Sequence, residues 1–300
     1  MREEYESEFY QSVRSKNQVF LMENSAFQNS LNEIWKLWSF ISGYRTYIVL
    51  GRDFVWVHDV LQDPLSDVYS LQTFLRSAEL TIGSIISCCE SGCMADANCL
   101  VRKYRDDMLF CVYIAVLDAN RRNHDTSEIT KQMEHNFEEW AKNSLKRLDV
   151  FRSNKGSKSV VDSIIASPVI QAAEQSYGLK DFLGNLNQRL NNYVHGNGID
   201  YYNGSILQLA GRAEKQIEEI VKDLYSITTT VLFMLALCSP AFLASTDYSD
   251  YLDVGMTPPE GSQYWVAPVI NDFFKENIDT LKGDINCIEF LKNTMQMEFD

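Results

Sequence analysis

The sequence has few prolines and glycines for its length. Six prolines and fourteen glycines are spread over 300 residues and form no tract, so no linker rich in these residues separates one domain from another. Hydrophobic residues make up 45% of the chain and charged residues 23%, which excludes the composition of a disordered protein. We therefore expect one continuous folded body with a sizeable core.

Basic residues are also scarce. The 27 lysines and arginines face 41 aspartates and glutamates, which gives a formal net charge of −14. Nonspecific binding to nucleic acid requires a basic surface, so we exclude a protein that coats nucleic acid and predict no stable DNA binding. A small catalytic pocket that is basic only locally remains compatible with this charge.

The chain lacks the motifs of several large enzyme classes. It contains no G-x-G-x-x-G, G-x-x-x-x-G-K-[ST], H-E-x-x-H or G-x-S-x-G pattern, which argues against dinucleotide, nucleotide, zinc-protease and serine-hydrolase chemistry. Of seven cysteines, Cys88, Cys89, Cys93 and Cys99 cluster without the second pair that a structural zinc site needs. We expect reduced, buried cysteines in preference to a metal site, and we predict no cofactor.

The first residues do not resemble a secretory signal. Met1 to Glu8 carry four glutamates against a single arginine, whereas a signal peptide begins with basic residues followed by an apolar run. We therefore expect a cytoplasmic protein.

Apolar residues recur at spacings of three and four along most of the chain, which is the pattern of amphipathic helices. No alternation of period two extends beyond four or five residues, so strands should be few or absent. The pattern predicts an all-α, multi-helix bundle of about eight to ten helices. The main predicted helical segments are residues 24–61, 65–90, 95–120, 125–150, 160–192 and 205–237, with closing helices over 264–281 and 284–297.

No charged residue lies between Asp223 and Asp247, and Val231 to Leu237 is almost purely apolar. Such a segment is either a membrane span or a central core helix. Acidic residues flank it where a span would carry basic anchors. We therefore predict a buried core helix and its exit, and no membrane contact.

The segment Tyr251 to Trp265 is long for an irregular connection and rich in aromatic and turn-forming residues. Long structured loops often carry function. Two interpretations remain: a packed Ω-like loop that seals the core, which we prefer, or a surface that covers a pocket or contacts a partner.

Three of the four histidines, His58, His124 and His135, are expected to be structural or solvated. His195 differs because it follows Arg189 by five intervening residues and precedes the glycine-rich run 196–198. This spacing resembles the motif of the HEPN family, an arginine, four to six residues and a histidine, although Leu190 stands where the family commonly has a polar residue. The resemblance implies a four-helix core, a homodimer in which two motifs face each other, and RNA cleavage without a metal ion.

On this resemblance Arg189 holds the phosphate and His195 exchanges a proton with the ribose 2′-hydroxyl or the leaving oxygen. Residues six apart on a helix differ by about 120° in azimuth, so the two side chains share a pocket only if the helix ends between them. The alternative is structural: Arg189 caps a helix and His195 bonds a backbone carbonyl. Predicted supporting residues, which orient the histidine or hold phosphate, are Arg102, Arg105, Asp106 and Asn192, and Arg102 and Asp106 are spaced to pair on one helix face.

The resemblance also implies a division of the chain. Residues 1–64 would form a helical region packed on the core, residues 65–246 a HEPN-like core with a helical insertion near 125–150, and residues 247–300 a loop and closing helices. The leading functional hypothesis is a metal-independent endoribonuclease of the bacterial toxin or phage-defence kind, with RNA as substrate and a partner or antitoxin protein. The alternatives are a non-catalytic helical interaction or regulatory protein and a membrane-associated effector.

Overall fold

The computed structural model describes residues 8–51, 71–141, 148–153, 158–202, 212–277 and 287–299. This part of the chain forms twelve α-helices, and its β-type pairing is limited to two isolated bridges, so the predicted all-α fold is confirmed. The helices are α1 (Glu8–Glu23), α2 (Ser25–Gly51), α4 (Leu71–Glu90), α5 (Met94–Arg122), α6 (Glu128–Ala141), α7 (Val160–Ile165), α8 (Pro168–Tyr177), α9 (Leu179–His195), α11 (Ala213–Cys238), α12 (Asp247–Asp253), α13 (Pro268–Asn277) and α14 (Cys287–Met295).

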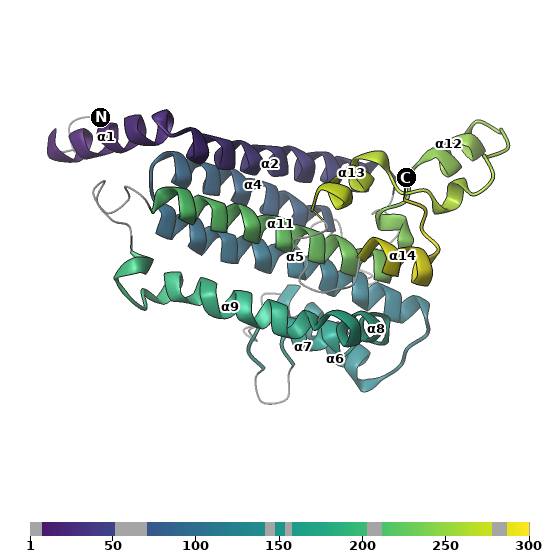
Figure 1. Ribbon diagram of the computed structural model, residues 1–300. Coiled ribbons are helices and arrows are strands. Elements are labelled where there is room, and N and C mark those ends of the chain that lie inside the picture. The colour runs from purple at the N-terminus through teal and green to yellow at the C-terminus, as the bar shows by residue number, and fades with distance from the viewer. Residues whose placement is uncertain are drawn as a thin grey trace.

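The long helices α2, α4, α5 and α11 form the core of the molecule (Figure 1). Helix α5 packs against α4 and α11, and α2 packs against the same two helices. Helix α9 lies on the outer side of α5, while α13 and α14 pack on α11. The domain boundary predicted near residue 64 lies outside the described residues, and the predicted insertion near 125–150 contains α6, which packs on α5.

Helix α11 is buried on all sides from Asp223 to Cys238, as a central core helix is. It is long and apolar enough to cross a membrane, but 83% of its most apolar stretch is buried inside the protein. Its consecutive threonines are satisfied within the fold: Thr228 Oγ1 donates to the Leu224 carbonyl at 2.7 Å and pairs with the Tyr104 hydroxyl at 2.7 Å. Buried hydroxyls with partners do not oppose burial of the helix.

The predicted helical segment 160–192 is divided into α7, α8 and the main part of α9, which is one reason the helix count exceeds the prediction. The Ser159 hydroxyl caps α7 by accepting from the Asp162 amide at 3.0 Å. Pro168 opens α8, where its missing N–H costs nothing. Gly178, with φ of 59°, separates α8 from α9, because this left-handed backbone is open to glycine. These breaks turn the chain so that α9 runs along α5.

The cysteine cluster lies where α4 ends and α5 begins. Cys89 is buried, whereas Cys88, Cys93 and Cys99 are half-buried. Burial raises the pKa of the Cys88 and Cys89 thiols, so both stay protonated at neutral pH. Within the described ranges, no group of three or more histidine, cysteine or acidic side chains is arranged to hold a metal ion.

Candidate functional site

Both residues of the Arg-x5-His motif lie on α9. The helix continues through His195 and ends at Gly196, whose φ is 56°. The Asn197 amide closes the end by donating to the Asn192 carbonyl at 3.0 Å. A side chain at Gly196 would also require the exposed Tyr202 ring to shift. The helix therefore ends after both motif residues and not between them.

The Arg189 side chain reaches across to α11. Its Nη2 makes an ion pair with the carboxylate of Asp223, while its Nη1 is buried and has no hydrogen-bond partner among the described residues. Burial raises the pKa of the Asp223 carboxyl, and the charge and hydrogen bond of Arg189 oppose that shift. Arg189 therefore joins two helices and does not cap α9.

His195 lies on the last turn of α9 with an exposed side chain. Within the part of the chain that the structure describes, its imidazole has no hydrogen-bond partner. Because the helix is intact between Arg189 and His195, the two side chains leave it in directions about 120° apart. A single chain thus places the motif on one helix end without bringing its two side chains into one pocket.

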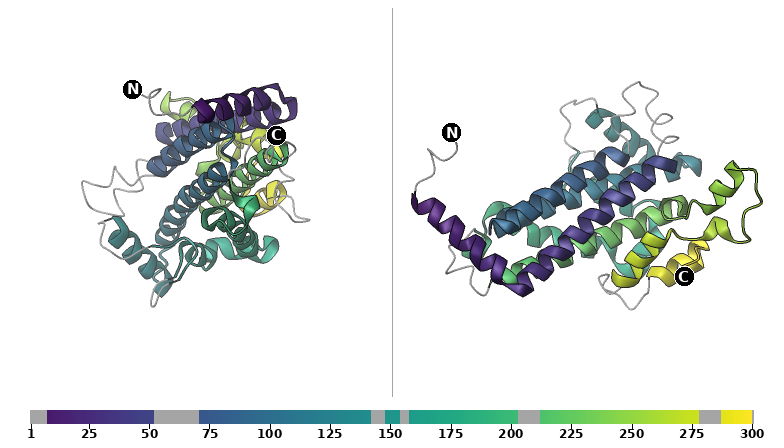
Figure 2. Two further views of the ribbon diagram at one scale, coloured as in Figure 1. Left: turned by 90° about the vertical axis from the view of Figure 1, so that its left-hand side faces the viewer. Right: turned by 90° about the horizontal axis from the view of Figure 1, so that it is seen from above.

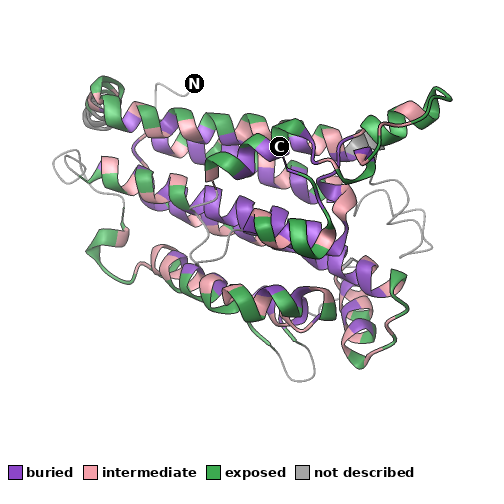
Figure 3. Cartoon of the chain, turned by 45° about the vertical axis from the view of Figure 1, so that its right-hand side comes forward, coloured by how far each residue is buried: buried purple, intermediate pink, exposed green. Residues whose placement is uncertain are grey.

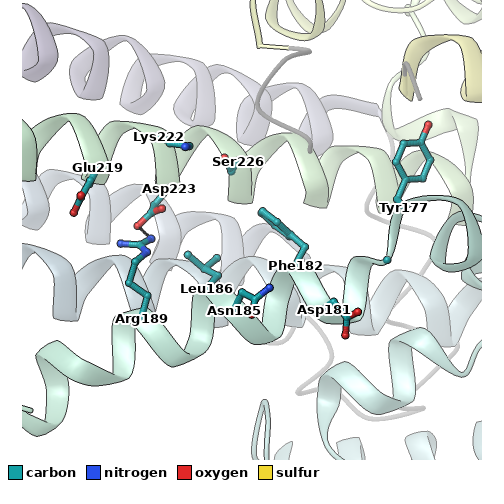
Figure 4. Close-up of a pocket in the computed structure, with 11 residues that line it drawn as sticks. Tyr177, Asp181, Phe182, Asn185, Leu186, Arg189, Glu219, Lys222, Asp223 and Ser226 are labelled. Atoms are coloured by element: carbon teal, nitrogen blue, oxygen red, sulfur yellow. Dashed lines mark hydrogen bonds and ion pairs between the residues drawn. The ribbon is translucent and has the colours of Figure 1, made fainter. Parts of the chain in front are cut away.

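The groove beside Arg189 has a volume of about 610 Å³ and runs between α9 and α11 (Figure 4). Phe182 and Leu186 give it an apolar part on α9. Its charged lining residues are three acids and two bases: Asp181, Glu219, Asp223, Arg189 and Lys222. This excess of carboxylates disfavours an anionic ligand such as a phosphate.

Arg105 and Asp106, two of the predicted supporting residues, form a buried network between α5 and α9. The Arg105 guanidinium pairs with Asp106 at 2.6 Å and donates to the Asn187 Oδ1 atom at 3.1 Å. Its central carbon lies 4.3 Å from the centroid of the Phe151 ring. Burial lowers the pKa of Arg105 and raises that of Asp106, and their pairing opposes both shifts. The network ties α9 to α5 at Asn187, two residues before Arg189.

The spacing of Arg102 and Asp106 suggested an ion pair, but the described partner of Asp106 is Arg105. Burial raises the pKa of the Asp106 carboxyl, and the charge of Arg102 opposes that rise together with Arg105.

Asn192 holds the end of α9 in place. Its amide nitrogen donates to the Tyr201 hydroxyl at 3.3 Å, and its oxygen accepts from the Asn197 side chain at 3.0 Å. The rings of Tyr193 and Tyr201 meet edge to face with centroids 5.0 Å apart. Asn192 therefore shapes the turn beside His195.

Asp223 is the site residue that sequence reasoning missed. It appeared only as the charge that ends an apolar run, and its partner is 34 positions away. The available signal was its place at the edge of a buried helix, because a carboxylate there requires a partner. The identity of that partner depends on how α9 packs.

The chain was compared with protein-family models, curated protein sequences and solved structures. None of the three comparisons finds a match.

Proposed function

We propose that the protein is a metal-independent, HEPN-like endoribonuclease that acts as a bacterial toxin or phage-defence effector. The observation that carries the proposal is the Arg-x5-His motif on the final turns of α9, with an exposed imidazole. The all-helical fold supports it. For Arg189 to bind the scissile phosphate, its ion pair with Asp223 must break, and the phosphate then takes the place of the carboxylate.

The chemistry requires no metal. The His195 imidazole removes the proton from the ribose 2′-hydroxyl, and the 2′-oxygen attacks the neighbouring phosphorus. A 2′,3′-cyclic phosphate forms as the bond to the 5′-oxygen breaks, and an imidazolium returns a proton to that oxygen. The Arg189 guanidinium offsets the charge that develops on the phosphate.

A second copy of the chain completes the proposed site. Arg189 and His195 diverge on one helix, so an arginine and a histidine converge only when another α9 lies opposite. Val194, Ile199 and Tyr202 are exposed apolar residues beside His195, and such patches mark protein–protein contacts. This arrangement agrees with the homodimer that the family resemblance implies.

A non-catalytic interaction protein is the second candidate. The ion pair between Arg189 and Asp223 supports it, because that pair gives the arginine a structural role. The acidic groove supports it as well.

Cleavage of a 5′-labelled RNA by the purified chain and its variants separates the two candidates. His195→Ala should lower the cleavage rate by about 10²- to 10⁴-fold without changing the melting temperature, because the side chain is exposed. His135→Ala is the matched control, since His135 is exposed on α6. Cleavage should survive EDTA and leave 2′,3′-cyclic phosphate ends.

Arg189→Ala needs a companion variant because it leaves Asp223 buried without its partner. The single variant should lose both activity and about 1–3 kcal/mol of stability. Arg189→Ala combined with Asp223→Asn should recover stability and stay inactive. Activity that disappears with EDTA, or that persists in both His195→Ala and Arg189→Ala, would exclude this site, and the absence of cleavage by the wild type would favour the interaction protein.

A further inference from the structure

Residues 246–264 form an arm at the end of the bundle opposite α1 (Figures 1 and 2). Backbone hydrogen bonds close its base: the Ser245 amide donates to the Trp265 carbonyl at 2.6 Å, and the Ala267 amide to the Leu243 carbonyl at 2.8 Å. Ala244 and Val266 form an antiparallel bridge there. The arm is therefore an Ω-like loop that is anchored at its base and projects from the bundle, and it does not seal the core as predicted.

The tip of the arm is ordered by its own backbone. Helix α12 ends where the Gly255 amide donates to the Leu252 carbonyl at 3.0 Å and the Met256 amide to the Tyr251 carbonyl at 2.8 Å. Gly255 has a φ of 71°, which completes a Schellman ending. A pre-ordered tip loses little conformational entropy when it binds.

Apolar side chains are concentrated on this projection. The exposed fractions are 52% for Leu252, 69% for Val254 and 58% for Met256, and Tyr248 is exposed one turn before Leu252. Figure 3 shows the arm as mostly exposed, in contrast to the helices of the core. Single apolar residues on a surface are ordinary, but a cluster on a projecting element marks a binding surface.

The charge of the arm limits what it can bind. It carries Asp247, Asp250, Asp253 and Glu260, and no basic residue occurs between Lys222 and Lys275. Four carboxylates repel nucleic acid and anionic membranes. They also repel a second copy of this chain, whose net charge is −14. They attract a surface bordered by lysine and arginine.

We propose that the arm inserts Leu252, Val254 and Met256 into an apolar pocket of a different protein whose rim is basic. The apolar residues provide the affinity, and the aspartates of α12 provide orientation and a fast encounter. This inference does not depend on RNA cleavage.

Photo-cross-linking in the native cells tests the proposal with the full chain. Met256 is replaced by p-benzoylphenylalanine, and the control carries the same residue at Met22, which is exposed on α1 far from the arm. The expected result is one protein that is cross-linked from position 256 and not from position 22. The purified partner should then bind the double variant Leu252→Ser/Met256→Ser at least about tenfold more weakly than the wild type. It should bind Met22→Ser with the affinity of the wild type.

Salt dependence tests the basic rim. Asp250→Asn/Asp253→Asn should weaken binding at low salt and flatten its decline as salt is added. A cross-link to a second copy of the chain, the absence of an arm-specific cross-link, or affinity and salt dependence unchanged by these variants would each overturn the proposal.

Discussion

Arg105 is a buried charge whose three guanidinium nitrogens all donate hydrogen bonds. Only 1% of the residue is exposed, and burial of an unpaired charge would be prohibitive. Asp106 supplies the counter-charge, Asn187 accepts a hydrogen bond, and Phe151 stacks on the guanidinium. The planar group makes all three contacts at once, which a lysine ammonium does not.

Replacement of Arg105 should therefore destabilise the fold even when the side-chain volume is kept. We expect Arg105→Met to lower the free energy of unfolding by about 3 kcal/mol, because it leaves Asp106 without its partner. The free energy of unfolding of Arg105→Lys should lie between those of Arg105→Met and the wild type. Urea denaturation measures the difference, and Lys131→Met, at an exposed position of α6, is the control. Unchanged stability of Arg105→Met would show that the network is dispensable.

At the scale of elements, periodicity was enough to predict α5, because its apolar residues recur over many turns. The buried course of α11 was predicted instead from its uncharged run and its acidic flanks, because a segment that is apolar on all sides has no polar face. Periodicity missed the division of residues 160–192, although Pro168 and Gly178 mark both breaks in the sequence. Short helices span too few turns to establish a period. The motif on α9 was visible as a local pattern, whereas the Arg189–Asp223 pair required knowledge of how α9 and α11 approach.

Helix α6 begins with a side-chain network that should respond to acid. The Asp125 carboxylate accepts from the Ser127 amide at 2.9 Å and the Thr130 hydroxyl at 2.8 Å. These hydrogen bonds hold the pKa of Asp125 below its usual value, and the bond from the Ser127 amide contributes most. A carboxyl whose pKa is lower in the folded state stabilises that state above its unfolded pKa, and the contribution is lost as pH falls through the folded pKa.

Asp125→Ala should therefore lower the melting temperature at pH 7. The difference from the wild type should persist down to about pH 4, near the pKa of an aspartate in the unfolded chain, and should narrow as the pH falls further. Thermal unfolding followed by circular dichroism at several pH values measures both effects. Asp181→Ala, at an exposed position of α9, is the control. A difference in melting temperature that stays constant with pH would mean that the charge of Asp125 does not contribute to stability.

Helix α11 predicts how the protein fractionates. Its apolar stretch is already covered by α2, α5 and neighbouring helices, so a bilayer would have to compete with an assembled core. We expect the chain, expressed without detergent, to remain in the supernatant after ultracentrifugation. Recovery only in a pellet that resists high salt and carbonate would establish a membrane-associated effector instead.

At the scale of the whole molecule, the proposed site depends on self-association at the end of α9. Val194, Ile199 and Tyr202 are exposed there, and Arg212 and Lys215 lie beside Asp200 and Glu219 in an adjoining groove, so the local charge is balanced. The rest of the chain is strongly acidic. Two copies should therefore attract each other through this end while their net charges oppose association.

This opposition gives the dimer an unusual dependence on salt. Added salt screens the repulsion between two chains of net charge −14 but leaves apolar contacts intact, so sedimentation should show more dimer at about 0.15 M salt than at about 0.01 M. Ile199→Asp should give a monomer with an unchanged melting temperature, because the residue is 76% exposed, and Met22→Asp should dimerise normally. RNA cleavage should fall together with the dimer fraction. A monomer at all salt and protein concentrations, or cleavage by monomeric Ile199→Asp, would exclude a site shared between two copies.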